Sequence, residues 1–240
     1  MIKTIIIETC PGCGSQAIVK NGTDYKGAQK YHCHDCGAYG TLKTSRKYDG
    51  NSREQILRAY LERASMRGIE RILGVARQTL ARWLAALAQA LPDLQTRLGK
   101  AHPNDVLELD ELWSFVYHKR NKRWIWIALC RRTRQVVAYA IGDRDEATCR
   151  RLWQRIPDAY RRCHTYSDFW QAYQKVFDSE RHHPVGKETG QTAHVERWNN
   201  TLRQRLARFV RKTLSFSKSD QFHDWVLKIF LHHYNLSVNM

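Results

Sequence analysis

The sequence predicts an α/β (α+β) protein in which a small amino-terminal module and a helical segment precede a larger mixed domain. Three observations carry this prediction. Two C-x2-C pairs lie within the first 36 residues. Apolar residues then recur at helical spacing as far as residue 84. From residue 105 onward, strand-like apolar runs alternate with helical segments.

The charge of the chain favours a polyanionic partner. Forty Lys and Arg stand against 23 Asp and Glu, which gives a net charge of +17. Proteins of this charge gain affinity for nucleic acid by releasing counterions from its phosphates. A basic ribosome-associated or membrane-surface protein is the alternative, but no basic amphipathic tail or lipidation motif is present. No run of about 18 apolar residues occurs, which excludes a membrane span, and the apolar opening is too short for a secretory signal.

The first module, residues 1–48, has the pattern of a zinc ribbon. Two C-x2-C pairs, each on a tight turn, supply four thiolates for one structural zinc ion: Cys10, Cys13, Cys33 and Cys36. Glycines at positions 12, 14 and 37 suit the turns. Residues 5–7, 17–20, 30–32 and 39–42 are expected to be short strands. Four unrelated buried thiols, or a redox pair, are the alternatives. His32 and His34 are expected to be neighbours of the zinc rather than ligands.

Residues 49–91 have the pattern of a helix-turn-helix DNA-binding domain. A helix over 54–63 is followed by two helices joined at Gly74 and Val75. Packing is expected between two apolar sets, Ile69, Ile72 and Leu73 against Leu80, Trp83 and Leu84. The polar residues near the start of the second of these helices would then face a DNA major groove: Arg77, Gln78, Thr79 and Arg82. A plain helical hairpin is the alternative. Residues 92–104, with two prolines and a glycine, are expected to be a linker.

Residues 105–240 have the element order of an RNase H-like fold. Strands are expected at 106–117, 122–130 and 134–141, and the short polar turns between them imply antiparallel pairing. A helix at 145–156, a strand at 163–167, a helix at 169–177 and a strand at 181–185 follow. A long basic helix is expected from about residue 191.

Three acidic residues are the candidate catalytic centre of this domain. Asp110 lies in the first strand, Asp168 at the end of the fourth and Glu196 on the basic helix. Three carboxylates can hold two divalent cations, Mg²⁺ or Mn²⁺, for phosphoryl transfer. Glu108, on the same strand face as Asp110, is the next candidate ligand, and Asp224 is a possible supporting residue. The alternatives are an edge-strand acid for Asp110, a helix cap for Asp168 and a surface pair for Glu196.

At these residues the chain resembles the transposases of the smallest bacterial insertion sequences, the insertion-sequence-one family. The resemblance runs from the CPGCG motif at 10–14 through Asp110-Glu111 and the Ser-Asp-Phe-Trp of 167–170. It continues through the block at 196–208 and the tail at 211–219. His223 and Asp224 follow this tail and belong to the same resemblance. It implies a DDE transposase with an RNase H-like domain and Mg²⁺ dependence. The family's triad maps to Asp110, Asp168 and Glu196, and its basic residue seven positions later maps to Arg203.

The resemblance also implies the substrate, the partners and the location. A full fusion of the short DNA-binding product with the catalytic half is expected, acting in the bacterial cytoplasm at the nucleoid. It would bind the terminal inverted repeats, cut the DNA and join its 3′ ends to target DNA. A homodimer or larger assembly on DNA is expected. Residues near the scissile phosphate would be Arg197, Asn199, Asn200 and Arg203. The alternatives are a repressor with a degenerate catalytic half and an RNase H-like or junction nuclease.

Overall fold

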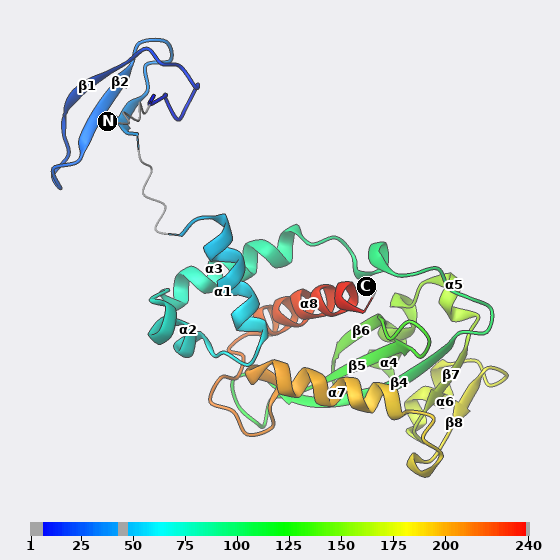
Figure 1. The fold of residues 1–240 in the computed structure, drawn as a ribbon. Helices are drawn as coiled ribbons and strands as arrows, with labels where there is room; N and C mark the ends of the chain where they lie inside the picture. The colour runs from blue at the N-terminus through cyan, green and yellow to red at the C-terminus, as the bar shows by residue number, and fades with distance from the viewer. Residues whose placement is uncertain (1–6, 43–47, 239–240) are drawn as a thin grey trace, which may run out of the picture. The chain divides into compact units, whose positions relative to one another are not determined.

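The computed structural model describes residues 7–42 and 48–238, which fall into two compact units, 1–53 and 54–240 (Figure 1). In both units the predicted strands and helices are present almost throughout. Among the described residues, every helix is too short or too polar to cross a lipid bilayer.

The first unit is a three-stranded antiparallel sheet in the order β1-β2-β3. Its strands are β1 (Ile18–Thr23), β2 (Gln29–Cys33) and β3 (Tyr39–Thr41). These confirm the strands expected at 17–20, 30–32 and 39–42. Of the strand expected at 5–7, residues 5 and 6 lie outside the described residues, and Ile7 is not in a strand. Cys10 and Cys33 are the only buried side chains of the described part of this unit, so it has almost no apolar core.

Three helices follow in the chain: α1 (Gly50–Leu61), most of which belongs to the second unit, α2 (Met66–Leu73) and α3 (Arg77–Ala90). Ser65 caps α2 by accepting from the N–H of Gly68. Gly74 ends α2 in the left-handed conformation, with φ 65°, which suits a residue without Cβ. α3 begins at Arg77, three residues after Gly74, so the turn lies where the sequence predicts it.

The packing of these helices differs from the expectation in one respect. Ile69 is buried as predicted, but Ile72 is 78% exposed and Leu73 is 42% exposed. Val75, which is fully buried, takes the inner position instead. The reason is the left-handed Gly74: it redirects the chain, so that the residue after it, and not the last turn of α2, is buried.

The large sheet has five strands in the order β6-β5-β4-β7-β8. The strands are β4 (Val106–Phe115), β5 (Lys122–Cys130), β6 (Val136–Gly142), β7 (His164–Ser167) and β8 (His182–Pro184). The first three are antiparallel, whereas β7 runs parallel to β4 and β8 parallel to β7. This mixed α/β arrangement agrees with the predicted order of elements and is consistent with an RNase H-like fold.

Helices cover both faces of this sheet. On one face, α4 (Glu146–Arg155), α5 (Asp158–Arg161) and α6 (Gln171–Val176) close a core around Leu107, Leu109 and Trp126. On the other face lie α7 (Ala193–Arg205) and α8 (Asp220–Ser237), which contact each other through Trp198 and Phe230. Because side chains alternate along a strand, β4 sends Leu107 and Leu109 to the first face, and Glu108 and Asp110 to the face covered by α7.

Helix α8 is the longest helix of the described chain and the largest element that the sequence analysis did not predict. It connects the sheet to the helical segment. Asn235 exchanges two hydrogen bonds of 2.9 Å with the backbone of Val136 in β6. Lys228 donates to the carbonyls of Ala88 and Leu91 at the end of α3, at 3.1 and 2.8 Å. In Figure 1, α3 lies beside α8.

Residues 92–104 run along this second unit and include a short 3-10 helix, η1 (Leu94–Arg97). Gly99 donates its N–H to Gln135 at 2.9 Å and accepts from the hydroxyl of Tyr160 at 2.8 Å. The segment is therefore held against the sheet. The boundaries 1–48, 49–91, 92–104 and 105–240 remain a prediction about which parts fold independently.

Candidate metal centre and active site

The four cysteines of the first unit form a cluster with the geometry of a tetrahedral metal site. Their sulfur atoms all lie within 4.8 Å of one another. The Sγ atoms of Cys10 and Cys36 are 3.6 Å apart, as are those of Cys13 and Cys33. A zinc ion with Zn–S bonds of about 2.3 Å requires sulfur atoms about 3.8 Å apart. The four side chains therefore fit one structural zinc ion, with each cysteine pair supplying half of the ligands.

Local backbone geometry explains how the two cysteine pairs converge. Gly14 and Gly37 each follow the second cysteine of a pair and have φ of 75° and 69°. Their N–H groups return to the carbonyls of Cys10 and Cys33, at 2.8 and 3.0 Å. These left-handed glycines close the two tight turns, as the sequence indicates. His32 and His34 are not members of the cluster.

In the second unit, Glu108 on β4 fixes the amino-terminal end of α7. Its side chain is fully buried. One carboxylate oxygen accepts from Arg131 at 2.7 Å and from the Nδ1 of His194 at 2.6 Å. The other accepts from the backbone N–H groups of His194 and Val195, at 2.8 and 3.0 Å. The predicted role of Glu108 as the next metal ligand does not fit this geometry, because both of its oxygens are occupied in holding α7.

Asp110 lies two residues after Glu108 on the same face of β4 and makes a second contact with α7. The amide of Asn199 donates to its carboxylate at 2.7 Å, and the N–H of Glu111 donates at 2.9 Å. Burial, together with the negative charges of Glu111 and Asp168, raises the pKa of Asp110 to about 7. A carboxylate crowded by other carboxylates and partly removed from water favours a bound cation.

Asp168 lies beside Asp110 because β7 is parallel to β4. The register pairs Leu107 with Thr165 and Glu108 with Tyr166. Continued two residues further, past the end of β7 at Ser167, this register places Asp168 level with Asp110, and the charge of Asp168 helps to raise the pKa of Asp110. One carboxylate oxygen of Asp168 accepts from the N–H of Trp170 at 3.0 Å. The side chain is 40% exposed, so it is open to a ligand.

Arg144 is a residue of this site that the sequence analysis did not identify. It binds the buried carboxylate of Glu111 and lies 3.7 Å from Asp168. Its guanidinium also lies over the rings of Trp124 and Trp170, at 5.0 and 4.2 Å from their centres. The hydroxyl of Tyr173 donates to the other oxygen of Glu111 at 2.9 Å. No local pattern distinguishes Arg144 from the other basic residues of the chain.

Glu196 lies in the first turn of α7, where it accepts from the hydroxyl of Thr192 at 3.1 Å. Asn199 follows it by three residues and shares its helix face, so this face of α7 is directed toward Asp110. The three acids are not in one tight group, however. Within 7–42 and 48–238, the four cysteines are the only set of three or more His, Cys, Asp or Glu whose ligand atoms lie within 4.8 Å of one another.

The other predicted site residues fall into two kinds. Arg203 donates to the carbonyls of Trp113 and Phe209 at 3.0 and 2.9 Å, and burial lowers its pKa to about 10. Asn199 is buried against Asp110, and Asp224 accepts from the hydroxyl of Tyr139 at 2.9 Å. Thr79 is half-buried. The remaining side chains are exposed: Arg77, Gln78, Arg82, Arg197 and Asn200.

Comparison with known proteins assigns this unit. Residues 105–236 match the IS1 transposase family, so the chain belongs to that family. It is 38% identical over 126 residues to the insertion element iso-IS1n protein InsB of Shigella dysenteriae, covering 52% of this chain and 93% of that protein. It is 39% identical over 124 residues to the insertion element IS1 protein InsB of Shigella flexneri, covering 52% and 92%. The predicted resemblance is confirmed: the chain is a DDE-type DNA transposase.

Proposed function

We propose that Asp110, Asp168 and Glu196 hold divalent metal, Mg²⁺ or Mn²⁺, and that the chain cuts and joins DNA at this centre. The observation that supports this most strongly is the parallel register of β4 and β7, which brings Asp168 beside a partly buried Asp110. Glu196 reaches the same place from α7 by giving up its hydrogen bond to Thr192. Two such metal ions, when bound, activate the attacking hydroxyl and stabilise the leaving oxygen of the phosphodiester.

The surrounding residues set the geometry of these carboxylates. Asn199 orients Asp110, and Glu108 fixes the start of α7, so both determine where Glu196 lies. Arg144 restrains Asp168 and neutralises Glu111 on the opposite face of β4. Arg203 ties α7 to the carbonyl of Trp113 and carries a positive charge close to Asp110. The charge and position of Arg203 suit a DNA phosphate near the site.

DNA binding is proposed for two further parts of the chain. The exposed side chains at the start of α3 suit base edges in the major groove of the terminal inverted repeats: Arg77, Gln78 and Arg82, with Thr79 beside them. Arg197 and Asn200 are exposed on α7 and suit the DNA near the cut. A zinc ion on the four cysteines stabilises the first unit. Acting on two element ends favours two active sites, so a homodimer or larger assembly on DNA is part of the proposal.

The test is cleavage of DNA that carries the ends of the chain's own insertion element. With Mg²⁺, the wild-type protein should nick at the ends and form strand-transfer products, and Asp110→Asn should do neither while binding the ends unchanged. Cleavage at the wild-type rate by Asp110→Asn would reject the proposed centre. Nicking without any joined product would favour a nuclease, and end binding without cleavage by the wild type would favour a repressor.

A further inference from the structure

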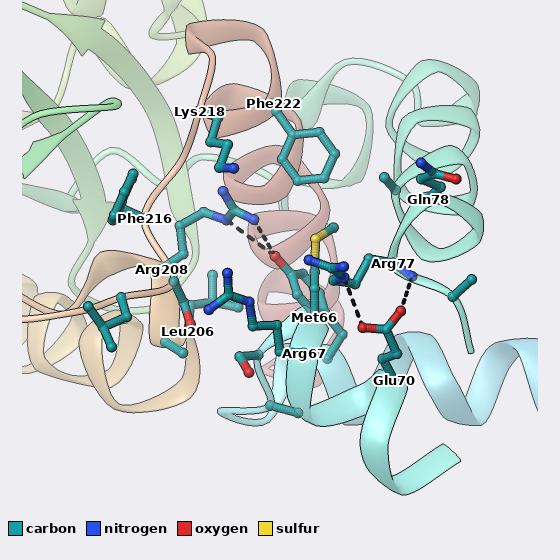
Figure 2. Close-up of a pocket in the computed structure, with 18 of the residues that line it drawn as sticks. Met66, Arg67, Glu70, Arg77, Gln78, Leu206, Arg208, Phe216, Lys218 and Phe222 are labelled. Carbon is teal, nitrogen blue, oxygen red and sulfur yellow. Dashed lines mark hydrogen bonds and ion pairs between the residues drawn. The ribbon is translucent and has the colours of Figure 1, made fainter. Parts of the chain in front are cut away.

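A groove with a volume of about 650 Å³ lies between the helix-turn-helix segment and the chain that follows α7. One wall comes from α2 and α3, and the other from residues 206–208 and 214–222. Figure 2 shows Arg67, Arg77, Arg208, Lys218 and Phe222 around this space. Its size is that of a small-ligand pocket, so it fits a short piece of a strand and not a whole duplex.

The groove carries an excess of positive charge. Four cations line it, Arg67, Arg77, Arg208 and Lys218, against one carboxylate, Glu70. Glu70 is already paired with Arg77 at 2.8 Å. Among the described residues, no Asp or Glu forms an ion pair with Arg67, Arg208 or Lys218. Unpaired cations gathered in one concave place favour an anionic ligand.

Arg208 is unusual among these cations because it is buried, with only 8% of its surface exposed. Its guanidinium donates to the hydroxyls of Tyr60 and Ser217, both at 2.9 Å. These neutral acceptors hold the side chain in place without neutralising it. A buried charge normally has a partner of opposite sign, and this one has none among the described residues.

Three helices also begin at the groove. The residues that precede the first turns of α2, α3 and α8 all line it: Ser65, Ala76 and Ser219. The amino-terminal end of a helix carries partial positive charge and free N–H groups, which suit phosphate. Ser65 and Ser219 cap α2 and α8 by accepting from the N–H groups of Gly68 and Phe222. Ala76 has no side chain that could cap α3, where the N–H of Arg77 donates to Glu70 at 3.5 Å. The helix ends therefore add to the field of the four cations.

We propose that this groove binds a backbone phosphate of DNA and so ties the DNA at α3 to the catalytic centre. Arg77 and Gln78 belong both to the groove and to the proposed base-reading surface. The opposite wall follows α7 directly in the chain, and Ser217 bridges to Val116 just after β4, the strand of Asp110. The inference rests on the proposed function in taking DNA as the polyanion.

The first test is the salt dependence of DNA binding by the full chain. Arg67→Gln with Lys218→Gln removes two exposed cations that make no side-chain hydrogen bond within the described part of the chain, so the fold should persist. In anisotropy titrations with a random-sequence duplex and no added Mg²⁺ or Mn²⁺, the log–log salt slope should become shallower by roughly 1.8, or about 0.9 per lost phosphate contact. The matched control, Arg150→Gln with Lys175→Gln, removes two charges from α4 and α6 on the other face of the sheet. Equal slopes for the two double variants would overturn the proposal.

The second test locates the DNA directly. Leu214 lines the groove and is 92% exposed, so p-benzoylphenylalanine placed there should crosslink to the duplex on irradiation. The same group at Leu236, which is 45% exposed on α8, serves as the control and should not crosslink. Crosslinking at Leu236 alone would contradict the assignment. Both tests omit catalytic metal, so a chain that fails to cut DNA but passes them would retain the groove and lose only the proposed reaction.

Discussion

Glu108 accepts two hydrogen bonds from His194, one from its backbone N–H at 2.8 Å and one from its ring Nδ1 at 2.6 Å. The two residues are 86 positions apart in the chain. A buried carboxylate on β4 thus replaces the local side-chain cap that α7 lacks. β4 and α7 are therefore fixed to each other just before the proposed metal ligands Asp110 and Glu196.

This contact predicts a strong effect of Glu108→Gln. The amide group cannot accept at both oxygen positions, so at least one buried N–H or the guanidinium of Arg131 loses its partner. The free energy of unfolding should fall by about 1–3 kcal/mol in urea titrations. Glu188→Gln, an exposed acid in the short 3-10 helix Lys187–Thr189 before α7, is the control and should change it by less than about 0.5 kcal/mol. Equal values for the two variants would show that Glu108 does not anchor α7.

Asn199→Ala should weaken metal binding with little loss of stability. The side chain orients Asp110 through one hydrogen bond of 2.7 Å, and residues that orient metal ligands are typically worth about 10–100-fold in metal affinity or activity. Mn²⁺ titrations followed by electron paramagnetic resonance should show this loss. Asn200→Ala, at an exposed neighbouring position, should retain the Mn²⁺ affinity. An unchanged affinity in Asn199→Ala would remove Asn199 from the site.

Removal of zinc should unfold the first unit and leave the second intact. Cys10 and Cys33 are the only buried side chains in the described part of the first unit, so little but the metal site can hold β1, β2 and β3 together. Cys13→Ser should therefore expose residues 7–42 to protease, while the unit 54–240 resists as in the wild type. Ser15→Ala, an adjacent change outside the cluster, is the control. A protease-resistant first unit after zinc removal would contradict the assignment.

His223 should make stability depend on acid pH. It is buried against Ser217, and burial followed by the charge of Arg208 lowers its pKa to about 3. Below the unfolded-state pKa of about 6.5, the unfolded chain binds a proton that the folded chain cannot, so stability falls by up to about 1.4 kcal/mol per pH unit until about pH 3. His223→Gln should reduce this slope between pH 6.5 and 4. An unchanged slope would place the acid sensitivity in other groups.

The sequence predicts most of the fold because its elements have clear local patterns. The expected strand at 122–130 is β5, and the four cysteines that meet in space are the two predicted pairs. Helix α8 lacks such a pattern. Buried residues run consecutively through 229–232, because α8 contacts both the sheet and α3, so it has no single apolar stripe.

The site is less predictable than the fold because its contacts join distant residues. Asp110 and Asp168 follow from strand order, since adjacent parallel strands end at one edge. The roles of Glu108 and Arg144 depend on which side chains meet across the sheet, and spacing in the sequence carries no information about that. The exposure of Ile72 likewise depends on the backbone angle of Gly74.

The central claim is that Asp110, Asp168 and Glu196 hold catalytic metal together, and Mn²⁺ binding by the zinc-loaded protein on DNA tests it most directly. Electron paramagnetic resonance titrations should show bound Mn²⁺ in the wild type. Each of Asp110→Asn, Asp168→Asn and Glu196→Gln should reduce the affinity by at least about tenfold, whereas Glu188→Gln should not. Wild-type Mn²⁺ affinity in Asp168→Asn or Glu196→Gln would show that the three carboxylates do not share a metal site.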